Sequence, residues 1–143
     1  MGKKNKTINF QLSKNKKIKL RYFGPFLANS RIPPQKIAVD EYFKKLSINE
    51  QKSSIWHELY HRKCLTGLKR IWLDIKCLFT KENSRWLEEF SADKYSAENN
   101  GKDNCLKLLY KCKDFYDKNI VDYDPDTHPA IEERIKRIKD LKE

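Results

Sequence analysis

Residues 47–65 read SINEQKSSIWHELYHRKCL, and this stretch decides how the rest of the chain is interpreted. Its first four residues, Ser47-Ile48-Asn49-Glu50, form a capping-box pattern, in which the serine and glutamate side chains each satisfy a free backbone N–H at the start of a helix. The sequence therefore predicts a helix from about residue 48 to residue 65 or beyond.

Two histidines lie four residues apart in this predicted helix, His57 and His61. That spacing places both imidazoles on one face, close enough to bind one zinc ion. Glu58 is angled away from the metal axis and can reach a water molecule at the metal, where it would act as general base. A catalytic zinc site has three protein ligands and an open position, so a third ligand must come from another element.

A second helix is predicted over residues 84–98, ended by Asn99-Asn100-Gly101. It carries Glu89 and Asp93 at i and i+4, with small Ser91 and Ala92 between them that allow another helix to approach closely. The pattern indicates Glu89 as the third ligand. Asp93 would then accept a hydrogen bond from the distal nitrogen of His57, as carboxylates beside metal-bound histidines do.

Two features of this interpretation stay open. Glu88 is expected to face elsewhere and is the weaker ligand candidate. A histidine pair on a helix can also be a partly exposed polar patch, and a glutamate-rich helix is often a solvated face.

The remaining pattern predicts an α+β fold, in which a small antiparallel or mixed sheet at the N-terminus is followed by helices. Residues 7–12 and 17–22 alternate apolar with polar side chains, which is typical of a half-buried hairpin. Residues 37–39 form a candidate third strand at an edge, and a third helix is expected over about residues 103–117. A last helix is predicted from Pro129, with one apolar stripe of Ile131, Ile135, Ile138 and Leu141.

Length and composition limit the function. The chain has 143 residues, which corresponds to a single domain over residues 1–143, and we expect residues 1–6 to fray. The net charge of +11 makes nucleic acid or anionic lipid conceivable partners, but the lysines are dispersed and no nucleic-acid motif is present. A transmembrane span and a secretory signal are not evident, so the sequence predicts a cytoplasmic protein.

Four cysteines, Cys64, Cys77, Cys105 and Cys112, lack the two-residue spacing of zinc knuckles and redox pairs. We interpret them as reduced and mostly buried thiols. A bond between Cys105 and Cys112, which share a helical face, stays an alternative.

The motifs His57-Glu58-x-x-His61, Glu89-x-x-Ala92-Asp93 and His128-Pro129, followed by Arg134-Ile135, together resemble the gluzincin metallopeptidases of the HtpX and CAAX prenyl protease type. The chain is most similar to their small soluble relatives, the minigluzincins, over about residues 36–141. The resemblance implies a minimal zincin fold with one Zn²⁺ bound by His57, His61 and Glu89. It also implies that Glu58 is general base and acid, and that Asp93 orients His57.

The resemblance further implies that His128 and Arg134 help to hold the substrate carbonyl and the oxyanion. The alternative is that Thr127 and His128 cap the last helix while Arg134 pairs with a nearby acid. The expected activity is hydrolysis of an extended peptide or protein substrate, which would pair with the strand of Ile37, Ala38 and Val39.

Two further segments have expected roles. The resemblance implies zymogen-like latency, for which residues 119–143 are the candidate segment, by covering the cleft of the same chain or of a second copy in a homodimer. Residues 65–80 could extend the first helix and pack in the core or an interface, or they could rest on a membrane surface. Competing functions are a basic nucleic-acid-binding module and an antirepressor-type regulatory metallopeptidase.

Overall fold

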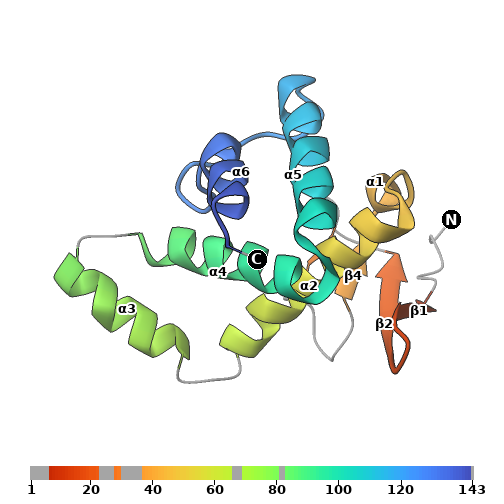
Figure 1. Ribbon diagram of the computed structural model, residues 1–143, viewed down its shortest axis with the longest axis horizontal. Coiled ribbons are helices and arrows are strands. Elements are labelled where there is room, and N and C mark those ends of the chain that lie inside the picture. The colour runs from red at the N-terminus through yellow and green to blue at the C-terminus, as the bar shows by residue number, and fades with distance from the viewer. Residues whose placement is uncertain (1–6, 23–27, 30–36, 66–68, 81–82, 143) are drawn as a thin grey trace, which may run out of the picture.

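The computed structural model describes residues 7–22, 28–29, 37–65, 69–80 and 83–142. The predicted fraying of residues 1–6 lies outside this range. The chain has the predicted α+β fold, with a small N-terminal sheet followed by helices that lie to one side of it (Figure 1).

The sheet has four strands in the order β1-β2-β4-β3. Strands β1 (Thr7–Ser13) and β2 (Lys16–Tyr22) form the predicted antiparallel hairpin, and Phe10 and Leu12 of β1 point into the core. Strand β4 (Ile37–Val39) pairs in parallel with β2 and antiparallel with β3 (Ala28–Asn29). The sheet is therefore mixed.

The prediction that residues 37–39 form an edge strand is wrong. β4 lies between β2 and β3, and Ile37, Ala38 and Val39 are all buried. A continuous apolar run of this kind is typical of a strand that is covered on both sides. Among the described strands, β3 is the outermost one on this side of the sheet, and it also packs against the histidine helix.

Six helices lie in the described part of the chain: α1 (Glu41–Lys44), α2 (Ile48–Leu65), α3 (Lys69–Thr80), α4 (Ser84–Asn100), α5 (Lys102–Asp117) and α6 (Ile131–Lys139). The capping box of α2 is formed as predicted: the Ser47 N–H donates to Glu50 Oε2 at 2.8 Å, and the Glu50 N–H donates to Ser47 Oγ at 3.2 Å. Helix α1, capped by Asp40, was not predicted. Residues 69–80 form a separate helix, and α6 begins at Ile131 with Ala130 as its N-cap.

Helices α2 and α4 pack closely because small side chains lie between them. Ala92 and Ser53 are fully buried, and Ser96 Oγ donates a hydrogen bond of 2.8 Å to the Ser53 carbonyl. One turn further on, Asn100 Nδ2 donates to Ser53 Oγ at 2.8 Å. These contacts fix the histidine face of α2 opposite the acidic face of α4.

The apolar stripe of α6 is buried within its own chain. Ile131, Ile135 and Ile138 form a core cluster with Ala97 of α4 and with Cys105 and Leu109 of α5. The C-terminal helix is thus part of the domain core, and a homodimer formed through residues 119–143 stays a prediction.

All four cysteines are free thiols, and three of them are buried. Burial raises the pKa of the Cys105 thiol to about 12, so this group stays protonated at neutral pH. No helix in the described part of the chain is long and apolar enough to cross a membrane.

Candidate metal centre

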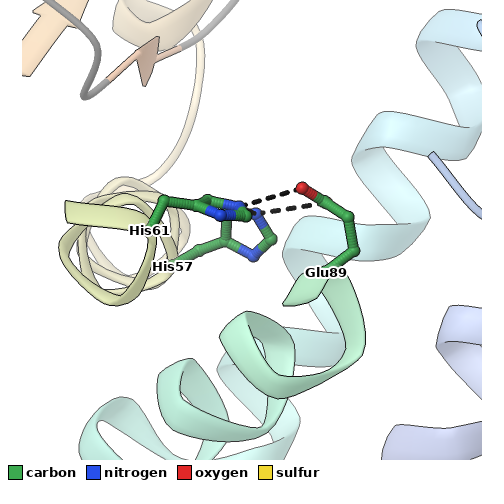
Figure 2. A group of neighbouring side chains, drawn as sticks. All are labelled: His57, His61 and Glu89. Carbon is green, nitrogen blue, oxygen red and sulfur yellow. Dashed lines mark hydrogen bonds and ion pairs between the residues drawn. The ribbon is translucent and has the colours of Figure 1, made fainter. Parts of the chain in front are cut away.

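Three side chains from two helices converge on one point between α2 and α4 (Figure 2). His61 Nε2 lies 3.0 Å from His57 Nε2 and 2.9 Å from Glu89 Oε1, and His57 Nε2 lies 3.4 Å from Glu89 Oε2. Two ring nitrogens and a carboxylate therefore face one another in a largely buried space. This group could hold a metal ion.

The spacing of these atoms fits a small, tetrahedrally coordinated cation. Nitrogen and oxygen ligands that bind zinc at about 2.0–2.1 Å in a tetrahedron lie about 3.3 Å from one another. The separations of 3.0, 2.9 and 3.4 Å lie close to that value. Imidazole nitrogens with a carboxylate are also the donor types that zinc accepts.

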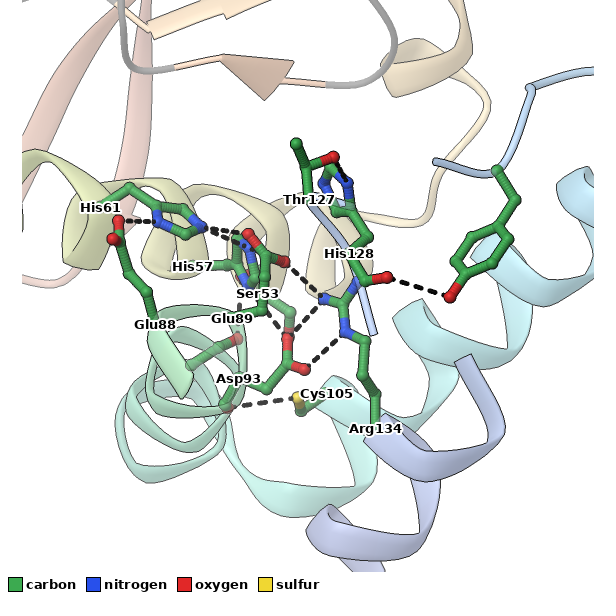
Figure 3. A network of polar contacts seen from close by, with 12 residues as sticks. Ser53, His57, His61, Glu88, Glu89, Asp93, Cys105, Thr127, His128 and Arg134 are labelled. Atoms are coloured by element: carbon green, nitrogen blue, oxygen red, sulfur yellow. Dashed lines mark hydrogen bonds and ion pairs between the residues drawn. The ribbon is translucent and has the colours of Figure 1, made fainter. Parts of the chain in front are cut away.

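Asp93 joins the site to a third helix (Figure 3). Its Oδ1 lies 2.9 Å from His57 Nδ1, and both of its oxygens accept hydrogen bonds of 2.7 Å from Nε and Nη2 of Arg134. Arg134 belongs to α6, and its Nη2 is 3.6 Å from Glu89 Oε2. Arg134 thus contacts two acids of α4, Asp93 and Glu89, which was the alternative interpretation of this residue.

Glu88 does not face elsewhere, contrary to the expectation from the sequence. Its side chain is buried, and its Oε1 lies 2.7 Å from His61 Nδ1 (Figure 3). Glu88 therefore stands to His61 as Asp93 stands to His57. With a hydrogen on each Nδ1, both Nε2 atoms are free to bind a cation.

The sequence did not predict the contact of Glu88 with His61, because the position of Glu88 on the helix alone does not indicate it. Glu88 is adjacent to Glu89, so the two side chains leave α4 about 100° apart. The length of the glutamate side chain and the close approach of α2 bring Glu88 to the outer side of the His61 ring. The one available signal was the Glu88-Glu89 pair itself, combined with the need of each metal-binding histidine for an orienting partner.

The acidic surroundings change the ionisation of both histidines. For His57, burial disfavours the charged form, but the Glu89 charge and the contacts with Asp93 and Glu89 outweigh it and raise the pKa to about 10. The pKa of His61 is also raised: its contacts with Glu88 and Glu89 outweigh burial and repulsion by His57. Without a metal ion, both histidine rings are therefore protonated more readily than a free histidine, and a cation that binds there would replace protons.

Glu58 and His128 lie outside the group of converging ligand atoms. Glu58 follows His57 on α2, is partly buried and acts electrostatically on Arg62. His128 lies in the loop before α6, where its Nδ1 is 2.7 Å from Thr127 Oγ1. Burial lowers the pKa of His128, so its ring is neutral at pH 7.

Thr127 and His128 do not cap the last helix. Thr127 Oγ1 donates to Asp124 Oδ2 at 2.8 Å, and the His128 N–H donates to the Asp124 carbonyl at 3.0 Å. The hydroxyl of Tyr123 donates to the His128 carbonyl at 3.0 Å. These bonds form a turn that holds His128, so that part of the alternative interpretation is wrong.

Comparison with known proteins adds no relative: no family model matches the chain, and neither a curated protein nor a solved structure is significantly similar to it.

The newly located Glu88 leads to a prediction for metal affinity. Replacing Glu88 with Ala removes the partner of His61 Nδ1, and we expect zinc affinity to fall about 10–100-fold. Glu88→Gln keeps an acceptor and should lose less. Competition with a chromogenic zinc chelator measures both, and Glu98→Ala, on the exposed side of α4, is the matched control. Unchanged affinity in Glu88→Ala would show that this carboxylate does not support His61.

The three histidines should titrate separately in the metal-free protein. After chelation, the imidazole signals in NMR spectra should give a pKa of about 10 for His57, a pKa above 6.5 for His61 and one below 6.5 for His128. Zinc must displace the protons on the first two rings, so zinc affinity should rise as the pH increases from 6 towards 10. A His57 that titrates near 6.5 in the folded protein would contradict the close contact with the two acids.

Proposed function

We propose that the protein is a zinc-dependent endopeptidase of the gluzincin type, similar to the minigluzincins. The observation that carries the proposal is the convergence of His57 Nε2, His61 Nε2 and the Glu89 carboxylate. The order of motifs along the chain supports it, because Glu58 lies between the histidines, and Asp93, His128 and Arg134 follow in the pattern of that family.

Zinc held by His57, His61 and Glu89 would polarise the peptide carbonyl and acidify a water molecule beside it. In this proposal Glu58 removes a proton from that water as its oxygen bonds to the carbonyl carbon. Glu58 then passes the proton to the amide nitrogen as the carbon–nitrogen bond breaks. The products are a carboxylic acid and an amine. The acid's remaining proton passes to the amine at neutral pH, which gives a carboxylate and an ammonium group, and Glu58 returns to its starting state.

Residues around the three ligands would hold the ligands and the substrate in position for the reaction. Arg134 acts as a positioning residue in this account, since two of its nitrogens are bound to Asp93, which in turn holds His57. His128 is the better candidate for direct contact with substrate. Its neutral ring is anchored through Nδ1 by Thr127, so Nε2 can make a hydrogen bond to a peptide group.

An extended substrate needs a strand edge near the metal helix. Strand β3 offers one, because it is the outer strand among those that the structure describes and packs against α2. In Figure 3, this short orange strand lies above the histidine pair. We propose that substrate adds to β3 by main-chain hydrogen bonds, in place of the pairing predicted for Ile37, Ala38 and Val39.

In this proposal the C-terminal segment supports the fold and the site, whereas we expected from the sequence that it would cover the cleft. Residues 119–143 contribute His128 and Arg134 to the surroundings of the metal site and the stripe of α6 to the core. In this proposal, latency would require a segment that blocks β3 or the metal site while α6 stays packed in the core.

The role of Glu58 can be separated from metal binding. Glu58→Gln keeps the size of the side chain but cannot accept the proton, so hydrolysis of quenched fluorescent peptides should fall about 10²–10⁴-fold. Zinc content should be unchanged, because Glu58 is not a ligand. Glu98→Gln, on the exposed face of α4, should retain the native rate. Full activity in Glu58→Gln would overturn the proposed mechanism, and so would failure of the zinc-loaded native protein to cleave a broad peptide library.

A further inference from the structure

Helix α3 exposes an apolar face that no described element covers. Its members are Ile71, Trp72, Ile75, Leu78 and Phe79, with exposed fractions from 50% for Ile75 to 85% for Phe79. At 100° per residue these five positions fall within an arc of about 120°. More than half of the large apolar side chains that the described chain exposes are therefore on one face of one helix.

The opposite face of α3 attaches the helix to the domain. Cys77 is buried there, and α3 packs against α4 and α2. Figure 1 shows α3 at the end of the molecule remote from the sheet. The apolar face thus points away from the core at an extremity, where a large partner can reach it without disturbing the fold.

The charge of this helix indicates what the partner is. Its sequence, KRIWLDIKCLFT, has three basic residues and one acidic residue, and the whole chain has a net charge of +11. Two copies of this helix placed face to face would bring like charges together. An anionic lipid surface instead offers hydrocarbon for the apolar face and negative headgroups for exposed Lys76.

The composition of the face fits the same partner. Trp72 and Phe79 are aromatic residues of the kind found on the apolar side of interfacial helices, beside aliphatic Ile71, Ile75 and Leu78. A helix of 12 residues is about 18 Å long, too short to span a bilayer of about 30 Å hydrocarbon thickness.

We propose that α3 is a membrane-surface helix that docks the protein on anionic lipid, with Ile71, Trp72, Ile75, Leu78 and Phe79 inserted among the acyl chains near the headgroups. This inference does not depend on the metal site or on peptidase activity. In the chain, α3 follows α2, which carries His57 and His61, and precedes α4, which carries Glu89, and it packs against both helices, so docking would hold the metal centre near the lipid surface.

Vesicle flotation of the full chain tests the proposal. The native protein should float with vesicles of phosphatidylcholine and phosphatidylserine and should bind vesicles of phosphatidylcholine alone at least about tenfold more weakly. Leu78→Ser/Phe79→Ser, both at highly exposed positions, should lower binding to the anionic vesicles at least about tenfold. Lys76→Glu should lower it about tenfold through charge.

A matched variant controls for general loss of apolar surface. Ile48→Ser/Ile120→Ser removes two exposed isoleucines outside α3 and should bind like the native protein, and circular dichroism checks that each variant is folded. Equal loss of binding in this control would overturn the proposal. Absence of binding to anionic vesicles would also overturn it. If sedimentation then showed a dimer that Leu78→Ser/Phe79→Ser abolishes, the apolar face of α3 would contact a second copy of the chain and not lipid.

Discussion

The arrangement of the helical part depends on how two of the three buried carboxylates of α4, those of Asp93 and Glu89, are neutralised. Asp93 and Glu89 are both less than a tenth exposed, and a charge in that position is costly unless it has partners. Asp93 meets His57 of α2 and Arg134 of α6, so a single carboxylate connects three helices. Removal of one partner from such a buried pair costs about 3–5 kcal/mol, which is a large part of the stability of a small domain.

Glu89 is neutralised in a different way from Asp93. Arg134 Nη2 lies 3.6 Å away, and the nearest atoms are the Nε2 atoms of two histidines, which must hold protons to interact with it favourably. A divalent cation would replace these protons and satisfy all three side chains at once. The outer contacts, Asp93 on His57 and Glu88 on His61, then hold each ring with its Nε2 directed at the ion. The same electrostatic arrangement thus connects the helices and gives this group the geometry to hold a metal ion.

Local signals in the sequence were enough for much of this structure. The capping box of α2, the alternation of β1 and β2, and the i, i+4 pairs on α2 and α4 all follow from short-range geometry, and the structure has these elements. The predictions that were wrong concern features that depend on contacts between segments far apart in the sequence. The central position of β4 requires β3 to fold back beside it, and the contact of Glu88 with His61 depends on how closely two helices approach. Helix α3 was hard to assign for a related reason, because most of its apolar side chains that the structure describes are exposed instead of packed in the core.

Metal content measured by elemental analysis tests the central claim most directly. The native protein, purified and dialysed against a zinc buffer, should carry about one zinc ion per chain, and Glu89→Ala should carry almost none while keeping its helical circular dichroism spectrum. Glu98→Ala, at an exposed position of the same helix, should retain the ion. A native protein without stoichiometric zinc, or a folded Glu89→Ala variant that keeps it, would contradict the assignment of this site.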